Sequence, residues 1–442
     1  MKIKGILFFI LIFFVSILDA QHLPIPTPQQ VEWHEMEFYL FMHFGPNTFT
    51  DKEWGLGDEP ENVFNPEQLD CKQWCRIAKA AGAKGIIITA KHHDGFCLWP
   101  SKYSTHTVRE SAWKNGRGDV LKELSAACAA YGLKFGVYLS PWDRNHPKYG
   151  TAEYNDVFVN MLKEIFSNYG PVWELWWDGA NGEGPNGKKQ EYDWQRFEKT
   201  VEHLSPNTLV FSDIGPHIRW VGNENGIAAT TNWNTLDTAG FKRGEGAPPT
   251  DSLSLGNVNG NSWIPAECDV SIRPGWFYHP EENDRVKSPG ELFQLYLKSV
   301  GRGANLLLNV PPDRKGLISR YDSASLVGFK NLRTQSFGKD LSKGFHLKTL
   351  EIEFNKSTPV DCIVLKENLR AGQHCKKFTL FLFDDHHRPI KKIDGTTIGH
   401  KRIITFLPVA LKTIRLKVVE QVGNTVLSQL AAYNVDEKLI EK

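Results

Sequence analysis

Cysteine is scarce in this sequence and is not arranged as a scaffold. The seven cysteines are odd in number, and no CxxC pair is matched by a second one. This pattern argues against a structural zinc site and against a disulfide framework. Cys71 and Cys75 lie on one predicted helix, where a disulfide is geometrically awkward, whereas a disulfide between Cys362 and Cys375 stays open.

An excess of charge of one sign is also missing. Lys and Arg total 52 and Asp and Glu total 51, and no basic run is long enough to bind nucleic acid or an anionic membrane. We therefore expect neither of these as a partner.

Long apolar runs are absent except at the start of the chain. Lys2 and Lys4 precede the apolar residues 6–18, and the small residue Ala20 follows them. A basic start, a short apolar stretch and a small residue at the cut are typical of a secretory signal, and the stretch is too short to span a bilayer. The sequence predicts a signal peptide over residues 1–20. The mature chain should be secreted or periplasmic and should not insert into a membrane.

What the sequence does contain, from about residue 36 to 311, is an alternation of apolar runs and amphipathic segments. The predicted buried strands are residues 38–44, 85–90, 134–139, 172–177, 208–212, 267–272 and 304–310. Helical periodicity covers residues 66–81, 119–131, 153–169, 191–204 and 289–302. With a weakly marked eighth strand near residues 228–230, this alternation predicts a (β/α)8-type (TIM-like) barrel over residues 21–340. An open doubly wound sheet is the alternative, but no Gly-rich phosphate turn follows the first strand.

The pattern changes near residue 340. Short runs typical of strands lie at residues 345–354, 358–365, 377–383, 403–407 and 413–419, with no long helix between them. Regularly spaced short strands predict a β-sandwich domain over residues 341–442. We expect it to support the barrel, because it has no cluster of chemically active residues.

Polar residues follow several of the predicted barrel strands. They are His43, His92, His93, Asp94, Asp178 and Asp213. In such a barrel the carboxyl ends of all strands open onto one face, which holds the active site. We therefore expect these residues to converge. A metal site made of His43, His92, His93 and Asp94 is an alternative, although adjacent histidines on a strand point to opposite faces.

Asp178 has the surroundings of a catalytic carboxylate. It follows an apolar strand within Trp176-Trp177-Asp178-Gly179, where the tryptophans can shield it from water and the glycine allows close backbone approach. Glycoside hydrolysis usually needs two carboxyl groups, one of which is the nucleophile in a retaining enzyme. The alternative interpretation is an Asp that caps a turn or starts a helix, which is common for Asp-Gly.

Five segments, taken together in this order, resemble the α-L-fucosidases of glycoside hydrolase family 29. They are residues 41–45 (FMHFG), 52–54 (KEW), 89–96 (TAKHHDGF), 136–140 (GVYLS) and 176–179 (WWDG). The resemblance implies a retaining mechanism without metal or organic cofactor, in which Asp178 forms a covalent fucosyl-enzyme. It also implies a fucosylated oligosaccharide or glycoconjugate as the substrate. The residues expected to line the sugar pocket are His43, Glu53, Trp54, His92, His93, Tyr138 and Trp176.

The acid/base residue is placed by a further resemblance. Residues 219–226 (RWVGNENG) resemble the branch of the family that acts on α-1,3 and α-1,4 fucosyl linkages, which implies that Glu224 is the acid/base. Asp213 and Glu267 are the rival carboxylates. Residues 269–279 resemble the same branch, so Arg273, Trp276 and Tyr278 are expected near the sugar or its leaving group.

Two other functions stay open at this point. A fucose-binding lectin would keep the pocket without catalysis. An α-L-fucosidase could instead have a broad linkage preference or prefer α-1,2 or α-1,6 linkages. Linkage preference depends on the shapes of the loops around residues 220–280, which one sequence does not reveal.

Overall fold

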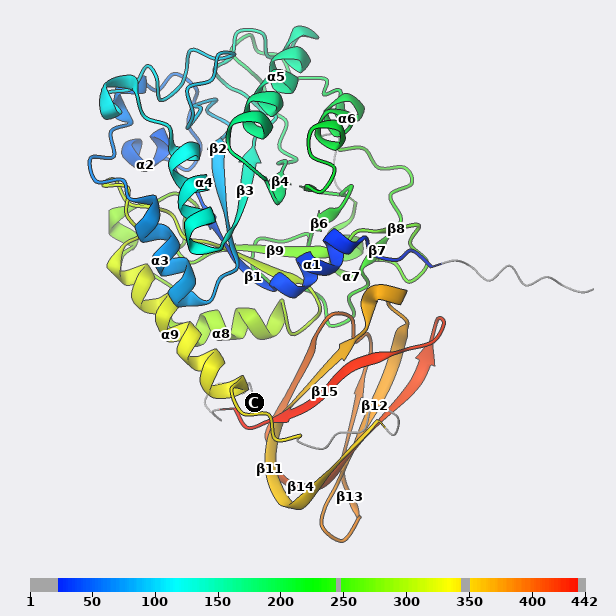
Figure 1. Ribbon diagram of the computed structural model, residues 1–442. Coiled ribbons are helices and arrows are strands. Elements are labelled where there is room, and N and C mark those ends of the chain that lie inside the picture. The colour runs from blue at the N-terminus through cyan, green and yellow to red at the C-terminus, as the bar shows by residue number, and fades with distance from the viewer. Residues whose placement is uncertain (1–22, 244–247, 343–349, 436–442) are drawn as a thin grey trace, which may run out of the picture.

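The structure is a computed structural model that describes residues 23–243, 248–342 and 350–435 (Figure 1). It consists of a closed barrel surrounded by helices, followed by an antiparallel β domain. None of the helices in these three ranges is long and apolar enough to cross a membrane. The predicted signal peptide lies outside the described residues.

Eight parallel strands close the barrel in the order β1-β10-β9-β6-β5-β4-β3-β2. Their bounds are β1 Phe38–Met42, β2 Gly85–Lys91, β3 Lys134–Leu139, β4 Glu174–Trp176, β5 Leu209–Ser212, β6 Ile218–Trp220, β9 Ala266–Ser271 and β10 Asn305–Asn309. All residues of β1, β2 and β10 are buried, which explains why these strands are nearly continuous apolar runs. The predicted barrel is thus confirmed.

Helices cover the outside of the barrel and one of its ends. They are α1 Pro28–Met36, α2 Pro46–Thr50, α3 Cys71–Ala81, α4 Val120–Tyr131, α5 Glu153–Asn168, α6 Trp194–Leu204, α7 Thr250–Leu255, α8 Pro289–Lys298 and α9 Arg320–Phe337. Short 3-10 turns lie at Glu61–Val63, Trp113–Gly116, Pro280–Glu282 and Leu369–Ala371. Helix α1 closes the amino-terminal end, where Trp33 donates to Glu174 at the start of β4. The opposite end, at the carboxyl ends of the strands, is left for a site.

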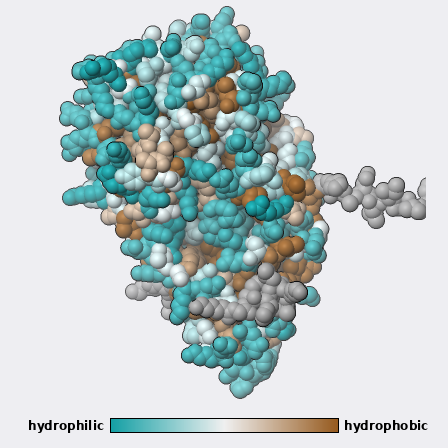
Figure 2. Space-filling model, in the orientation of Figure 1, coloured by the Kyte–Doolittle hydropathy of each residue, from teal (hydrophilic) through white to brown (hydrophobic). Residues whose placement is uncertain are grey.

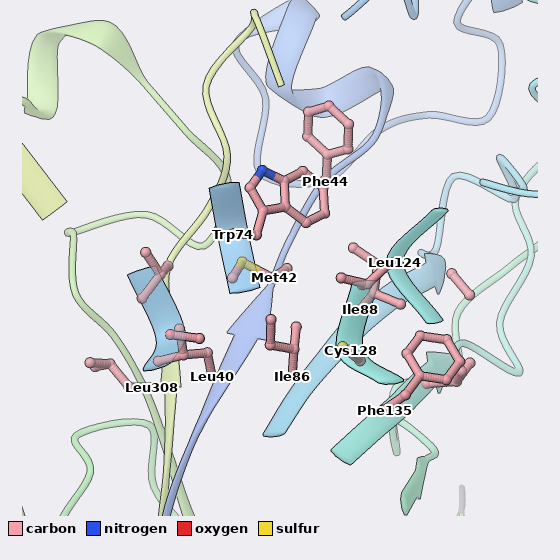
Figure 3. Packing of buried hydrophobic residues seen from close by; sticks show 14 of the residues in the cluster. Leu40, Met42, Phe44, Trp74, Ile86, Ile88, Leu124, Cys128, Phe135 and Leu308 are labelled. Carbon is pink, nitrogen blue, oxygen red and sulfur yellow. The ribbon is translucent and has the colours of Figure 1, made fainter. Parts of the chain in front are cut away.

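The core between strands and helices is close-packed. Figure 3 shows side chains of β1 and β2 meeting Trp74 of α3 and Leu124 and Cys128 of α4. Asp70 caps the start of α3 by accepting hydrogen bonds from the amides of Lys72 and Gln73. On the face in Figure 2, apolar surface is broken into small areas among polar side chains.

The eighth strand is not where the sequence indicated. Residues 228–230 are irregular, and the strand is β6, which follows β5 after only five intervening residues. This strand is three residues long and contains Arg219, whose buried guanidinium donates to the carbonyls of Leu253, Ile264 and Trp233. A short strand with a buried arginine has no apolar signature, which is why it was missed.

The carboxyl-terminal domain is built of strands, as predicted, and in its described residues they form one antiparallel sheet. Its strands are β11 Glu351–Glu367, β12 Cys375–Phe383, β13 Pro389–Gly395, β14 Arg402–Gln421 and β15 Leu427–Tyr433, bonded in the order β13-β12-β14-β11-β15. The predicted strands 403–407 and 413–419 form one long strand, β14. Register shifts in β11 and β14 bend the sheet over its own apolar cluster. A small pair, β7 Thr235–Leu236 and β8 Ser262–Trp263, belongs to the barrel domain.

All seven cysteines are buried and none forms a disulfide. Strand β14 lies between β11, which carries Cys362, and β12, which carries Cys375. The sheet order therefore separates the two cysteines whose pairing the sequence left open.

Candidate active site

A cavity of about 210 Å³ opens at the carboxyl ends of the barrel strands, and we call it the central cavity. It is lined by Phe41, His43, Glu53, Trp54, His92, His93, Tyr138, Trp176, Asp178, Ala180, Glu224, Asp269 and Trp276. A second cavity of about 230 Å³, the side cavity, shares Trp176, Asp178, Ala180, Glu224 and Asp269 with it and adds Asp213. The barrel has thus brought together residues more than 200 positions apart in the sequence.

Asp178 lies two residues beyond β4 and is held in place by its neighbours. Its Oδ1 accepts a hydrogen bond of 2.8 Å from the amide of Ala180, and its Oδ2 accepts one of 3.0 Å from the Tyr138 hydroxyl. The Nε2 atom of His93 lies 3.7 Å from Oδ2. The preceding Trp177 is fully buried against Trp194 of α6, so alternation along the chain directs Asp178 into the cavity.

The three histidines of the cavity are kept neutral by burial. Burial lowers the pKa of His43 to about 3 and that of His93 to about 4, and it lowers the pKa of His92 well below its ordinary value. Neutral imidazoles carry one donor and one acceptor nitrogen, so they can bind uncharged hydroxyl groups from either side.

Hydrogen bonding assigns the tautomer of two of these histidines. The Oδ1 of Asn309 accepts from the amide and from Nδ1 of His43, which leaves Nε2 of His43 as an acceptor. The Ser140 hydroxyl donates to the carbonyl of Trp142 and so accepts from Nδ1 of His93. In the described structure the buried Nδ1 of His92 has no partner, and a buried polar atom of this kind is normally satisfied by a bound ligand or water.

The four-residue metal site is not assembled. Within residues 23–243, 248–342 and 350–435, the one group of three or more acidic, histidine or cysteine side chains whose ligand atoms converge is Asp51, His279 and Glu281. The carboxylate of Asp94 instead accepts from the amide of Phe96. His43, His92, His93 and Asp94 therefore do not share a coordination point.

Glu224 stands in the loop after β6, at the rim of both cavities. The Nε1 of Trp276 donates to its Oε2 over 3.3 Å. Partial burial raises the pKa of Glu224, and the negative charges of Asp178 and Glu53 raise it further, against the hydrogen bond from Trp276. A raised pKa suits a carboxyl group that must carry a proton at the start of a reaction.

The two rival carboxylates occupy different places. Asp213 lines the side cavity, where burial and the charge of Asp178 raise its pKa to about 7. Glu267 lies beneath the cavity floor, where its carboxylate accepts from Tyr39 and from Nε1 of Trp176, and it lines neither cavity.

Asp269 was missed by the sequence analysis as a pocket residue. It lines both cavities, accepts a 2.9 Å hydrogen bond from Nε1 of Trp220, and has its pKa raised well above the ordinary value by burial. Because Glu267 and Asp269 are two residues apart on β9, they share the inward face of the strand. That spacing is the signal that could have revealed it.

Aromatic rings form much of the cavity wall. Trp176 stacks on Phe211 with ring centroids 3.9 Å apart, and Trp276 lies 5.1 Å from the His43 ring. Trp54 is 54% exposed and meets the His93 ring edge-on, so it stands at the mouth. Flat apolar faces among hydrogen-bonding side chains are typical of a small polar ligand site.

The structure does not bring Arg273 to the cavity. Its guanidinium is fully buried and pairs with the equally buried Asp322 of α9, with further hydrogen bonds to Asn283 and Ser319. Tyr278 also lines neither cavity; its ring packs on this guanidinium, 4.6 Å from ring centroid to Cζ. The expectation that Arg273 and Tyr278 approach the sugar is therefore corrected. The five N–H donors of a buried guanidinium need fixed acceptors, and Arg273 finds them in Asp322, Asn283 and Ser319.

Comparison with known proteins identifies the family of this chain. A family model described as alpha-L-fucosidase matches residues 23–330, which comprise the barrel and all the cavity residues. The chain belongs to the α-L-fucosidase family. Alpha-L-fucosidase 1 of Arabidopsis thaliana is 36% identical over 449 residues, covering 93% of this chain and 88% of that protein.

Two solved structures match nearly the whole length of this chain. A glycoside hydrolase 29 family member from an unknown rumen bacterium is 42% identical with a TM-score of 0.87, covering 94% of this chain and 78% of the other. A glycoside hydrolase family 29 fucosidase of Ruminococcus gnavus in complex with fucose is 27% identical with a TM-score of 0.83, covering 95% and 96%. The protein is therefore an enzyme of the glycoside hydrolase class.

Proposed function

We propose that this protein is an exo-acting, retaining α-L-fucosidase that removes terminal α-1,3- or α-1,4-linked fucose from glycans. The observation that carries the proposal is one small cavity holding both Asp178 and Glu224 among neutral histidines and aromatic rings. Its volume of about 210 Å³ lies below the ~300–1,000 Å³ of drug-sized ligand sites, which suits one sugar unit. We further propose that the chain is exported by a cleaved signal over residues 1–20.

The chemistry follows from the two carboxyl groups. Asp178 attacks the anomeric carbon, while protonated Glu224 gives its proton to the departing glycosidic oxygen. Glu224 then deprotonates a water that hydrolyses the fucosyl-Asp178 ester, and the proton returns to Glu224. The hydrogen bonds from Tyr138 and the amide of Ala180 hold the Asp178 carboxylate in position. No step requires a metal or an organic cofactor.

Substrate binding uses the remaining wall. His43 offers an acceptor nitrogen that suits a hydroxyl group of the sugar, and His92 and His93 line the same cavity. Phe41 and Trp276 supply apolar surface on which a methyl group can rest. A deoxy sugar with three free hydroxyls and one methyl group matches a cavity wall that is polar at the histidines and apolar at Phe41 and Trp276.

Variants of the two carboxylates test the mechanism. Asp178→Ala should abolish turnover of an aryl fucoside. Glu224→Ala should lose about 10²–10⁴-fold on substrates with poor leaving groups, lose much less on activated ones, and regain turnover with azide. A uniform loss in Glu224→Ala without rescue would transfer the acid/base role to Asp213. The matched variant for comparison is therefore Asp213→Ala, because Asp213 lines the side cavity.

Product analysis on α-1,2-, α-1,3-, α-1,4- and α-1,6-fucosylated oligosaccharides tests the linkage. We expect release of fucose from the α-1,3 and α-1,4 compounds with retention of anomeric configuration. Fast cleavage of α-1,2 compounds alone would refute the linkage assignment. Tight binding of fucose without any release would identify a lectin instead.

A further inference from the structure

His279 bridges two acidic residues at the edge of the central cavity. Its Nδ1 lies 2.8 Å from Oδ1 of Asp51 and its Nε2 lies 2.6 Å from Oε1 of Glu53. Asp51 caps the end of helix α2, whereas His279 follows β9. This contact therefore joins the loops after the first and seventh strands of the barrel in chain order. Both loops contribute walls to the cavity.

Glu53 uses the same carboxylate to hold the backbone of the second loop. Its Oε2 accepts from the amide of Trp276 over 2.7 Å and its Oε1 accepts from the amide of Phe277 over 3.1 Å. Gly275 makes this approach possible, because a Cβ there would lie 2.6 Å from Oε1 of Glu53 and 2.9 Å from the His279 ring. Gly275, Glu53 and His279 therefore pack together without space for a side chain at position 275.

The held segment carries the indole that contacts Glu224. The carbonyl of Trp276 accepts from Nδ2 of Asn309 over 2.7 Å, so both sides of this residue are fixed. Its Nε1 donates to Glu224, which stands in a loop between two glycines of positive φ, Gly222 and Gly226. The orientation of Glu224 thus depends on where the Trp276 indole is placed.

The charges favour a protonated bridge. Partial burial lowers the pKa of His279, but hydrogen bonds to Asp51 and Glu53 and the charge of Glu282 raise it above its ordinary value. Arg314 also faces Asp51, at 3.4 Å, and Glu281 lies beside the bridge. An imidazolium between two carboxylates satisfies both of its nitrogens.

We propose that His279 is a positioning residue that locks Glu53 onto the Trp276 backbone and so orients the Trp276 indole toward Glu224. The consequence for catalysis rests on the proposed function of Glu224 as acid/base. The bridge itself does not, and its effect on the indole can be measured without turnover.

The test compares His279→Gln with His106→Gln. His106 is also a buried histidine paired with a carboxylate, its Nδ1 lying 2.8 Å from Oε1 of Glu61, and it lines neither cavity. For each variant, kcat/KM is measured on an aryl fucoside with a good leaving group and on an alkyl fucoside with a poor one. We expect His279→Gln to lose roughly tenfold more on the poor leaving group, because a misplaced acid matters only where protonation is needed. His106→Gln should change both substrates equally.

A second readout separates this inference from the proposed function. In protein labelled with ¹⁵N-tryptophan, the indole N–H resonance of Trp276, assigned with Trp276→Phe, should shift in His279→Gln and stay in place in His106→Gln. An unmoved resonance, or equal losses on both fucosides in His279→Gln, would overturn the positioning role. An inactive wild type would refute the proposed function, while the indole resonance would still decide whether His279 holds Trp276.

Discussion

Replacing Arg273 by methionine should destabilise the protein far more than it weakens sugar binding. The reason is that Arg273 and Asp322 are both fully buried and joined by three N–O contacts of 3.0 to 3.1 Å. Methionine keeps much of the volume but leaves the Asp322 carboxylate in a dry site without its cation. Asn283 and Ser319 also lose a hydrogen-bond partner.

Breaking a buried ion pair by removing one member costs about 3–5 kcal/mol. With an unfolding entropy of about 2.1 cal/mol/K per residue over a chain of 442 residues, that loss corresponds to about 3–5 °C in Tm. The double variant Arg273→Met/Asp322→Leu should recover at least half of it, because no uncompensated charge remains.

The assay is a thermal unfolding series of the wild type, both single variants and the double variant, with KM for an aryl fucoside measured on each. We expect KM in Arg273→Met to stay within about threefold of the wild type, since the guanidinium lines neither cavity. A Tm loss under about 1 °C, together with a KM raised more than tenfold, would refute the reasoning and return Arg273 to the sugar.

Two further predictions concern the site. Gly179→Ala should cost roughly 1–3 kcal/mol and lower kcat/KM, since its Cβ would lie 2.0 Å from Oδ2 of Asp213; an active variant with unchanged Tm would contradict this contact. With a poor leaving group, kcat/KM should fall as pH rises through the pKa of Glu224, which lies above the ordinary ~4.3, because the acid must be protonated. That limb should be absent in Glu224→Gln; a limb near pH 7 that instead vanishes in Asp213→Asn would assign the acid to Asp213.

Much of the barrel could be read from the chain because its strands are buried on both faces. Runs such as those of β1 and β2 contain almost no polar residue, so their positions follow from composition alone. Strand β6 could not be found in this way, because Arg219 is stabilised by carbonyls that come from distant segments. Helix α9 was also absent from the predicted helices.

Some residues of the site could likewise be identified from local sequence and others could not. The residues at strand ends, such as His43, His92 and Asp178, were identified from local sequence, because parallel strands deliver their carboxyl ends to one face whatever the details of packing. Residues in the segment after β9 could not be sorted locally. Trp276 reaches the cavity and Arg273, three residues earlier, does not.

Local polarity and motifs were therefore enough to predict the barrel, its family and the nucleophile candidate. The packed fold was needed to show which carboxyl groups share the cavity with Asp178, that Asp269 joins them, and that Arg273 pairs with Asp322. Those outcomes depend on burial and on partners contributed by other strands and helices. Both are properties of the packed chain and of no single segment.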